Sequence, residues 1–253
     1  MKTIILSDLY WEGHLRSITE DEIEKFRNED IDKTRYFSIK RYLNIILEEK
    51  ANLVLFAGDV TGDGSCGHGF QYAFLILLKI LESLKIDTCY ISGNHDEPPY
   101  YSIVNNRVRD YKYIKEISNK TIDINGVKVL GIPYETTYSK TKIKALYKII
   151  EEDKHQYDII IAHSQLKRRI QLFDIDTKVI ITGHYDRKIM AFNQSAFISL
   201  DNDSSEISYA IFNQEESNET VSIAVLNAFD DTYSITEKIN NLHSDNREVH
   251  IDK

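Results

Sequence analysis

Five short clusters of polar residues combine carboxylates, imidazoles and a carboxamide, which are side chains that bind divalent metal ions. They comprise Ser7 to Tyr10, Gly58 to Gly64, Gly93 to Asp96, His163, and Gly183 to Asp186. These ligand types together suit an ion of borderline hardness such as Mn²⁺, Fe²⁺, Zn²⁺ or Ni²⁺. A carboxylate shared by two such ions holds them about 3.5 to 4 Å apart, and the pair activates a water and stabilises charge on a phosphoryl group. The residue types therefore predict two-metal hydrolysis of a phosphoester.

Each cluster directly follows a short apolar run that predicts a β-strand. The predicted strands are 3–6, 53–57, 88–92, 158–162 and 178–182. In layered α/β folds the carboxyl ends of the strands lie along one edge of the sheet, so we expect the clusters to converge on one crevice. The glycines that open three of the clusters would let the backbone approach a ligand closely.

The remaining patterns predict helices that alternate with the strands along the chain, which is typical of an α/β protein. Apolar residues at helical spacing predict helices over 32–50, 70–84 and 140–152. Asn125-Gly126 predicts a type I′ turn between strands 120–125 and 127–132. Four short runs at 188–192, 196–200, 206–212 and 220–226 predict an antiparallel meander that closes a second sheet. Residues 98–113 are interpreted as a loop, whose aromatic side chains either stack on a substrate base or pack.

The chain shows no repeat, linker or low-complexity segment, which favours one domain. We assign residues 1–229 to this domain. Residues 230–253 are polar and charged, and they are interpreted as either a C-terminal tail or a late strand.

Composition limits the partners and the compartment. The 253 residues include 31 Lys and Arg against 40 Asp and Glu, a net charge of −9, which disfavours a protein that coats nucleic acid in bulk. Two cysteines, Cys66 and Cys89, are too few for a disulfide scaffold and favour a reducing compartment. The N-terminus lacks the apolar region of a signal peptide, and no run approaches the ~20 apolar residues of a membrane span. We expect a soluble cytoplasmic protein with no membrane partner.

The order and context of the clusters resemble the calcineurin-like metallophosphoesterases, in particular their phosphodiesterase and exonuclease branches. That family carries Asp-x-His, Gly-Asp, Gly-Asn-His-(Asp/Glu), a lone His, and Gly-His-x-His, and the resemblance spans Asp8 to Asp186. It implies a four-layer α/β/β/α sandwich with two mixed β-sheets. It also implies a centre of two divalent ions at the carboxyl ends of the strands.

The resemblance assigns ligands to the second metal site, which is intact in this sequence. Asp59 would bridge the two ions, and Asn94, His163 and His184 would complete the second site. A hydroxide that bridges the ions would attack phosphorus in line.

The resemblance also assigns the groups that assist the leaving group. His95 would contact the phosphate and protonate the departing oxygen, with Asp96 orienting its ring.

The first metal site departs from the family pattern. Tyr10 and Asp186 stand where the family has histidines, whereas Asp8 and the bridging Asp59 remain. A carboxylate of Asp186 can still bind metal, but a neutral phenol is a poor ligand. The first site is therefore rich in oxygen and expected to be weak. Manganese is the expected metal at both sites, with magnesium or iron as alternatives.

Two residues next to the clusters are candidates for substrate or metal contact, as is Tyr10. They are His68, which follows the Asp59 cluster, and Arg187, which follows the last cluster. The alternative for Arg187 is a solvated surface position, and for Tyr10 it is packing beside Trp11.

The leading hypothesis is a metal-dependent phosphoesterase that hydrolyses a phosphodiester, more readily than a monoester. Its substrate would be a nucleotide, a cyclic nucleotide or a nucleic-acid end, so its partner is a phosphorylated small molecule or such an end. The alternative, suggested by Tyr10 and Asp186, is a degenerate member that serves as a non-catalytic binding scaffold, as the retromer subunit of this superfamily does. The sequence leaves the oligomeric state open.

Overall fold

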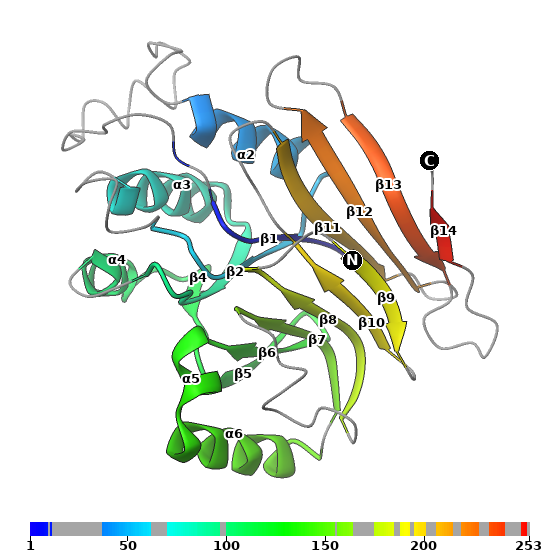
Figure 1. The fold of residues 1–253 in the computed structure, drawn as a ribbon. Coiled ribbons are helices and arrows are strands. Elements are labelled where there is room, and N and C mark those ends of the chain that lie inside the picture. The colour runs from blue at the N-terminus through cyan, green and yellow to red at the C-terminus, as the bar shows by residue number, and fades with distance from the viewer. Residues whose placement is uncertain are drawn as a thin grey trace.

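Two β-sheets lie face to face, and helices cover the outer face of each (Figure 1). The computed structural model describes residues 1–9, 11, 37–61, 70–96, 100–154, 156–163, 175–184, 188–192, 195–200, 206–214, 219–227, 233–240 and 249–251. The predicted α/β/β/α sandwich with two mixed sheets is confirmed.

The first sheet has the strand order β14-β13-β12-β11-β1-β2-β3-β4. Its parallel strands are β1 (Lys2–Leu6), β2 (Leu53–Ala57), β3 (Asp87–Ile91) and β4 (Ile114–Glu116). Its antiparallel strands are β11 (Glu206–Gln214), β12 (Glu219–Asn227), β13 (Tyr233–Asn240) and β14 (Val249–Ile251). The predicted first three strands are therefore neighbours in this sheet.

The second sheet has the strand order β5-β6-β7-β8-β10-β9. Its strands are β5 (Lys120–Ile124), β6 (Val127–Ile132), β7 (Gln156–Ala162), β8 (Asp176–Thr182), β9 (Lys188–Phe192) and β10 (Ser195–Ser199). Strands β6, β7, β8 and β10 are parallel, and β5 and β9 are antiparallel edges. Asn125 and Gly126 both have positive φ, 52° and 83°, as the predicted type I′ turn requires.

Alternation along the strands separates three hydrophobic cores. In β1, Ile4 faces the core beneath the helices, and Ile5 faces the core between the sheets.

The helices on the first sheet are α2 (Phe37–Glu48), α3 (Phe70–Leu84) and α4 (Tyr100–Val108). On the second sheet lie α5 (Tyr134–Tyr138) and α6 (Lys140–Glu152), and α6 buries Leu146 and Ile150 against it. The predicted helix over 32–50 is observed from residue 37, because 32–36 lie outside the described residues.

The predicted loop over 98–113 contains helix α4 instead, and strand β4 begins directly after it. Tyr101, Val104 and Val108 fall on one helical face and pack in the core above the first sheet. The ring of Tyr101 meets the ring of Tyr90 edge to face, with centroids 5.9 Å apart. Of the two alternatives for the aromatic residues of this segment, Tyr101 therefore packs rather than offering a free face to a base.

The predicted meander that closes a second sheet is wrong. Strands β9 and β10 join the second sheet, with β10 parallel to β8, whereas β11 to β14 extend the first sheet. Strand β11 covers the open edge of β1, with Ile4 opposite Ile211 and Ile5 opposite Ala210. Alternation in the sequence sets the side chain's face, but it does not specify which strand edge is nearest. The boundary at residue 229 stays a prediction.

Within the described residues, no helix combines the length and the apolar composition of a membrane span.

Candidate metal centre

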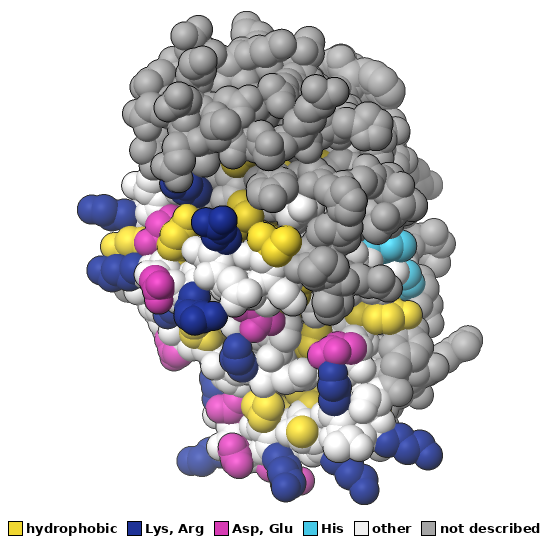
Figure 2. Space-filling view, turned by 90° about the vertical axis from the view of Figure 1, so that its left-hand side faces the viewer, with side chains coloured by type: hydrophobic (Ala, Val, Ile, Leu, Met, Phe, Trp, Pro, Cys, Tyr) yellow, Lys and Arg dark blue, Asp and Glu magenta, His cyan; other side chains and the backbone are white. Residues whose placement is uncertain are grey.

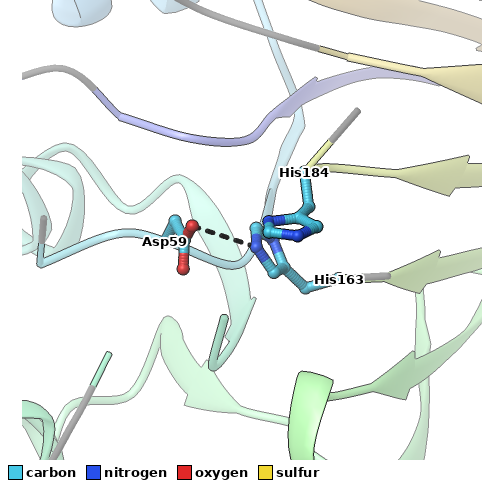
Figure 3. Close-up of side chains that lie close together, drawn as sticks. All are labelled: Asp59, His163 and His184. Carbon is cyan, nitrogen blue, oxygen red and sulfur yellow. Dashed lines mark ion pairs between the residues drawn. The ribbon is translucent and has the colours of Figure 1, made fainter. Parts of the chain in front are cut away.

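The polar clusters from both sheets meet at the carboxyl edge of the strands. Asp8 follows β1, Asp59 follows β2 and Asn94 follows β3 in the first sheet, while His163 follows β7 and His184 follows β8 in the second. Figure 3 shows Asp59, His163 and His184 pointing toward one another, and their ligand atoms lie within 4.8 Å of one another. The structure thus brings together residues that are as far apart as 176 positions in the chain.

His163 presents one ring nitrogen to the centre and uses the other for support. Its side chain is fully buried, and Nδ1 lies 2.8 Å from the carbonyl oxygen of Ala57. A carbonyl only accepts, so Nδ1 carries the hydrogen and Nε2 is the nitrogen that faces the site. Nε2 lies 3.0 Å from both Asn94 Oδ1 and Asp59 Oδ2, and 4.0 Å from Asp8 Oδ1. One nitrogen surrounded by oxygens is a donor set that fits a divalent ion, with the backbone carbonyl as its outer support.

The carboxylates of Asp59 and Asp8 are anchored by backbone N–H groups of neighbouring loops. Asp59 is 6% exposed, and its Oδ1 accepts a hydrogen bond of 2.8 Å from His95 N. Asp8 Oδ2 accepts one of 3.0 Å from His184 N. Through these oxygens Asp59 holds the loop after β3, and Asp8 holds the loop after β8. The other oxygen of each carboxylate lies toward His163 Nε2.

Three residues of the centre have an unusual backbone conformation. Asp8, Asp59 and His184 all have left-handed φ angles, 51°, 52° and 74°. Non-glycine residues rarely adopt this region, and such outliers persist mainly where function holds them. A Cβ on Gly93 would overlap Asp59 Oδ1 and the Asp59 backbone nitrogen. The close approach of the loops after β2 and β3 therefore requires glycine at 93.

Asp96 ties these two loops together. Its buried carboxylate accepts hydrogen bonds from Thr61 N at 2.8 Å, Thr61 Oγ1 at 2.7 Å, Gly93 N at 2.7 Å and Val60 N at 3.2 Å. The side chain of His95 is exposed. Orientation of His95 by Asp96 stays a prediction, and the observed contacts of Asp96 are with backbone and hydroxyl groups of the loops.

Residues 1–186 match the family model described as calcineurin-like phosphoesterase. The chain belongs to this family. The calcineurin-like phosphoesterases are metal-dependent hydrolases of phosphoesters, and the observed donor set agrees with a metal-binding member.

Single relatives of this calcineurin-like phosphoesterase are distant. This chain is 25% identical over 140 residues to the DNA double-strand break repair protein Mre11 of Saccharolobus solfataricus. The aligned residues make up 54% of this chain and only 36% of that protein. A dimetal phosphatase from Danio rerio has the same fold, with a TM-score of 0.54, 11% identity, and coverage of 92% of this chain and 98% of that one. A Vps29 variant from Entamoeba histolytica is similar at a TM-score of 0.44 and 13% identity, over 95% of this chain and 99% of that one.

The candidate metal centre of this calcineurin-like phosphoesterase has two carboxylates around one buried imidazole. Burial would lower the pKa of His163, but its hydrogen bond and charge interaction with Asp59 outweigh burial and raise the pKa to about 9. Burial would raise the pKa of Asp59, but the same contact with His163 holds it below its usual value. Burial raises the pKa of Asp8 to about 6. Without a metal, a proton on His163 therefore balances the carboxylates where a cation would bind.

We expect metal affinity to rise with pH, because a cation must displace the proton of His163. With a pKa of about 9 in the metal-free protein, the association constant for Mn²⁺ should rise about tenfold per pH unit between pH 7 and pH 9 and then level off. The same ion pair stabilises the metal-free fold fully below pH 6.5, and this stabilisation is lost as the pH rises through about 9. Calorimetric titrations at several pH values, in buffers of different ionisation enthalpy, measure both affinity and proton release. An affinity that is constant from pH 7 to pH 9 would contradict this assignment.

Four predicted site residues lie outside the described residues: Tyr10, His68, Asp186 and Arg187. Sequence reasoning missed Tyr134, whose ring centroid lies 5.8 Å from that of His184 and 6.3 Å from that of His163. The available signal was its position two residues after the apolar run 127–132, which places it at the carboxyl end of a strand as the other clusters are.

Proposed function

We propose that this phosphoesterase hydrolyses phosphodiesters with two divalent ions, and that manganese is its metal. The observation that carries the proposal is the buried Nε2 of His163, 3.0 Å from both Asp59 Oδ2 and Asn94 Oδ1. Bound ions would supply an activated water and neutralise charge on the phosphoryl group.

The residues of the chain divide between the two ions as the family pattern implies. Asp59, Asn94, His163 and His184 would hold the second ion. Asp8, with Asp59 and Asp186, would hold the first, with Tyr10 beside it. The strand order supports this division. Asp8 follows β1 and Asn94 follows β3, and Asp59 follows β2 between them. Asp8 Oδ1 lies 4.0 Å from His163 Nε2.

His95 would act on the leaving group. Its backbone N–H is held by Asp59 Oδ1 at 2.8 Å, so the residue is anchored to the bridging carboxylate. Its imidazole is exposed and therefore accessible to a substrate. An imidazole in hydrogen-bond reach of the departing oxygen can donate a proton to it.

Charge favours a small substrate or a chain end over a long nucleic acid. The net charge is −9. Figure 2 shows acidic and basic side chains interspersed over the described part of the face that lies to the left in Figure 1. Bound cations would reverse the local charge around the carboxylates of Asp8 and Asp59 without changing the rest of the surface. We therefore propose a nucleotide, a cyclic nucleotide or a nucleic-acid end as the substrate; similarity to part of Mre11 supports the last of these.

Hydrolysis of two chromogenic esters tests this function. With Mn²⁺ added, we expect turnover of bis(p-nitrophenyl) phosphate to exceed that of p-nitrophenyl phosphate, as a preference for diesters requires. Protein stripped of metal by a chelator is the control, and it should regain activity when Mn²⁺ is returned. Faster hydrolysis of the monoester would overturn the diester preference. Absence of turnover with Mn²⁺, Mg²⁺, Fe²⁺ and Co²⁺ would overturn the proposed enzymatic function and favour the alternative, a non-catalytic binding scaffold.

A further inference from the structure

Tyr134 is anchored between the two sheets at the edge where the metal ligands converge. It is the first residue of α5, two residues after the end of β6, and its backbone N–H donates to the carbonyl oxygen of Ser92 at 3.2 Å, just beyond β3. Thr137 Oγ1 donates to the carbonyl oxygen of Tyr134 at 2.7 Å, and Thr136 Oγ1 donates to Asn119 Oδ1 at 2.7 Å. Both threonines are buried. The backbone of Tyr134 is therefore held on both sides.

The ring of Tyr134 contacts both imidazoles of the centre. Its centroid lies 5.8 Å from that of His184 and 6.3 Å from that of His163, with interplanar angles of 60° and 64°. The two imidazoles are themselves 5.4 Å apart and tilted by 57°. Tilted pairs at these separations are favourable arrangements of aromatic rings. The three rings thus form one cluster, in which Tyr134 is the member that carries no metal-binding nitrogen.

The two histidines differ in burial and in backbone conformation. His163 is fully buried, and Nδ1 is fixed by the carbonyl oxygen of Ala57. His184 is half-buried, and it follows β8 with a left-handed φ of 74°. Because His184 is less buried than His163, loss of the Tyr134 ring would leave the imidazole of His184 more room to rotate.

We propose that Tyr134 is a positioning residue of the metal centre, whose ring holds the imidazole of His184, and to a smaller degree that of His163, in the orientation that binds a cation. The inference rests on the metal centre of the proposed function, but not on the reaction or the substrate. The proposed role belongs to the aromatic ring, so Tyr134→Phe should retain it.

Cobalt binding tests the proposal without any activity measurement. Co²⁺ is titrated into metal-free protein and followed by its visible absorption, which reports both affinity and ligand geometry. We expect Tyr134→Leu to weaken Co²⁺ binding about tenfold, equivalent to about 1.4 kcal/mol, and to alter the absorption band. Tyr134→Phe should bind Co²⁺ as the wild type does, with the same band. Tyr134→Met, which keeps a long apolar side chain without a ring, provides a second test if the leucine variant does not fold.

Tyr147→Leu is the matched control, because Tyr147 is a partly buried tyrosine on α6 that packs against the core of the second sheet. It should leave cobalt binding and the band unchanged. Folded Tyr134→Leu or Tyr134→Met protein with wild-type affinity and band would overturn the positioning role alone. An equal loss in Tyr147→Leu would also overturn it, since the effect would then be general. Wild-type protein that binds no divalent metal would overturn the metal centre and this inference together.

Discussion

Replacing Asp59 with asparagine is expected to abolish tight metal binding, and phosphoester hydrolysis with it. Asp59 is buried, and its Oδ2 lies 3.0 Å from His163 Nε2 at the centre of the donor set. The amide is nearly the same size and can keep the acceptor for His95 N, so the loop should stay in place. The change therefore removes the negative charge with little change in shape. Loss of an outer supporting residue already costs about 10- to 100-fold in metal affinity, so removal of a shared ligand should cost more than about 100-fold.

Metal content by mass spectrometry and Mn²⁺ affinity by calorimetry measure the effect of Asp59→Asn. Asp110→Asn is the control, because Asp110 is an exposed carboxylate just after α4, outside the polar clusters. It should retain wild-type metal content and turnover. An Asp59→Asn protein with wild-type Mn²⁺ affinity would show that Asp59 is not a ligand. Retained affinity with lost turnover would instead assign Asp59 to the reaction and not to metal binding.

Gly93→Ala should disrupt the centre from the backbone side. The added Cβ would overlap the side chain and the backbone nitrogen of Asp59, and neither can move freely. Asp59 Oδ1 is held by His95 N, and Gly93 N itself donates to the buried carboxylate of Asp96 at 2.7 Å. The loops after β2 and β3 must therefore separate. We expect the free energy of unfolding to fall by about 3 kcal/mol, the upper part of the usual range for overpacking, and metal affinity to fall strongly.

Denaturant unfolding of the metal-free protein and Mn²⁺ titration measure the two effects of Gly93→Ala separately. Gly126→Ala is the matched control, because Gly126 has a φ of 83° and no atom within 4 Å of an added Cβ. It should cost about 1 to 2 kcal/mol of backbone strain and leave Mn²⁺ affinity unchanged. Wild-type stability and affinity in Gly93→Ala would mean that the two loops do not need their close approach.

Local patterns in the sequence were sufficient to predict most of the elements and the type of chemistry. The apolar runs before Asp8, Asp59 and His163 are strands, because buried parallel strands need continuous β-branched and aliphatic residues. Residues 70–84 form α3 because their apolar side chains recur at helical spacing. The polar residues just after these strands converge, since parallel strands end at a common edge.

The sequence by itself determined most of the elements, their buried faces and the metal-binding residue types. Only the tertiary structure decided that β11 pairs with β1, that Asp96 joins the loops after β2 and β3, and that Tyr134 lies against His163 and His184. The physical reason is that alternation and helical period describe how one segment meets the core, whereas neighbours across sheets depend on which edges and loops remain open after the strands pair. Asp96 joins two loops of the first sheet, and Tyr134 connects the second sheet to the first through Ser92. Both contacts join residues that are distant in the sequence.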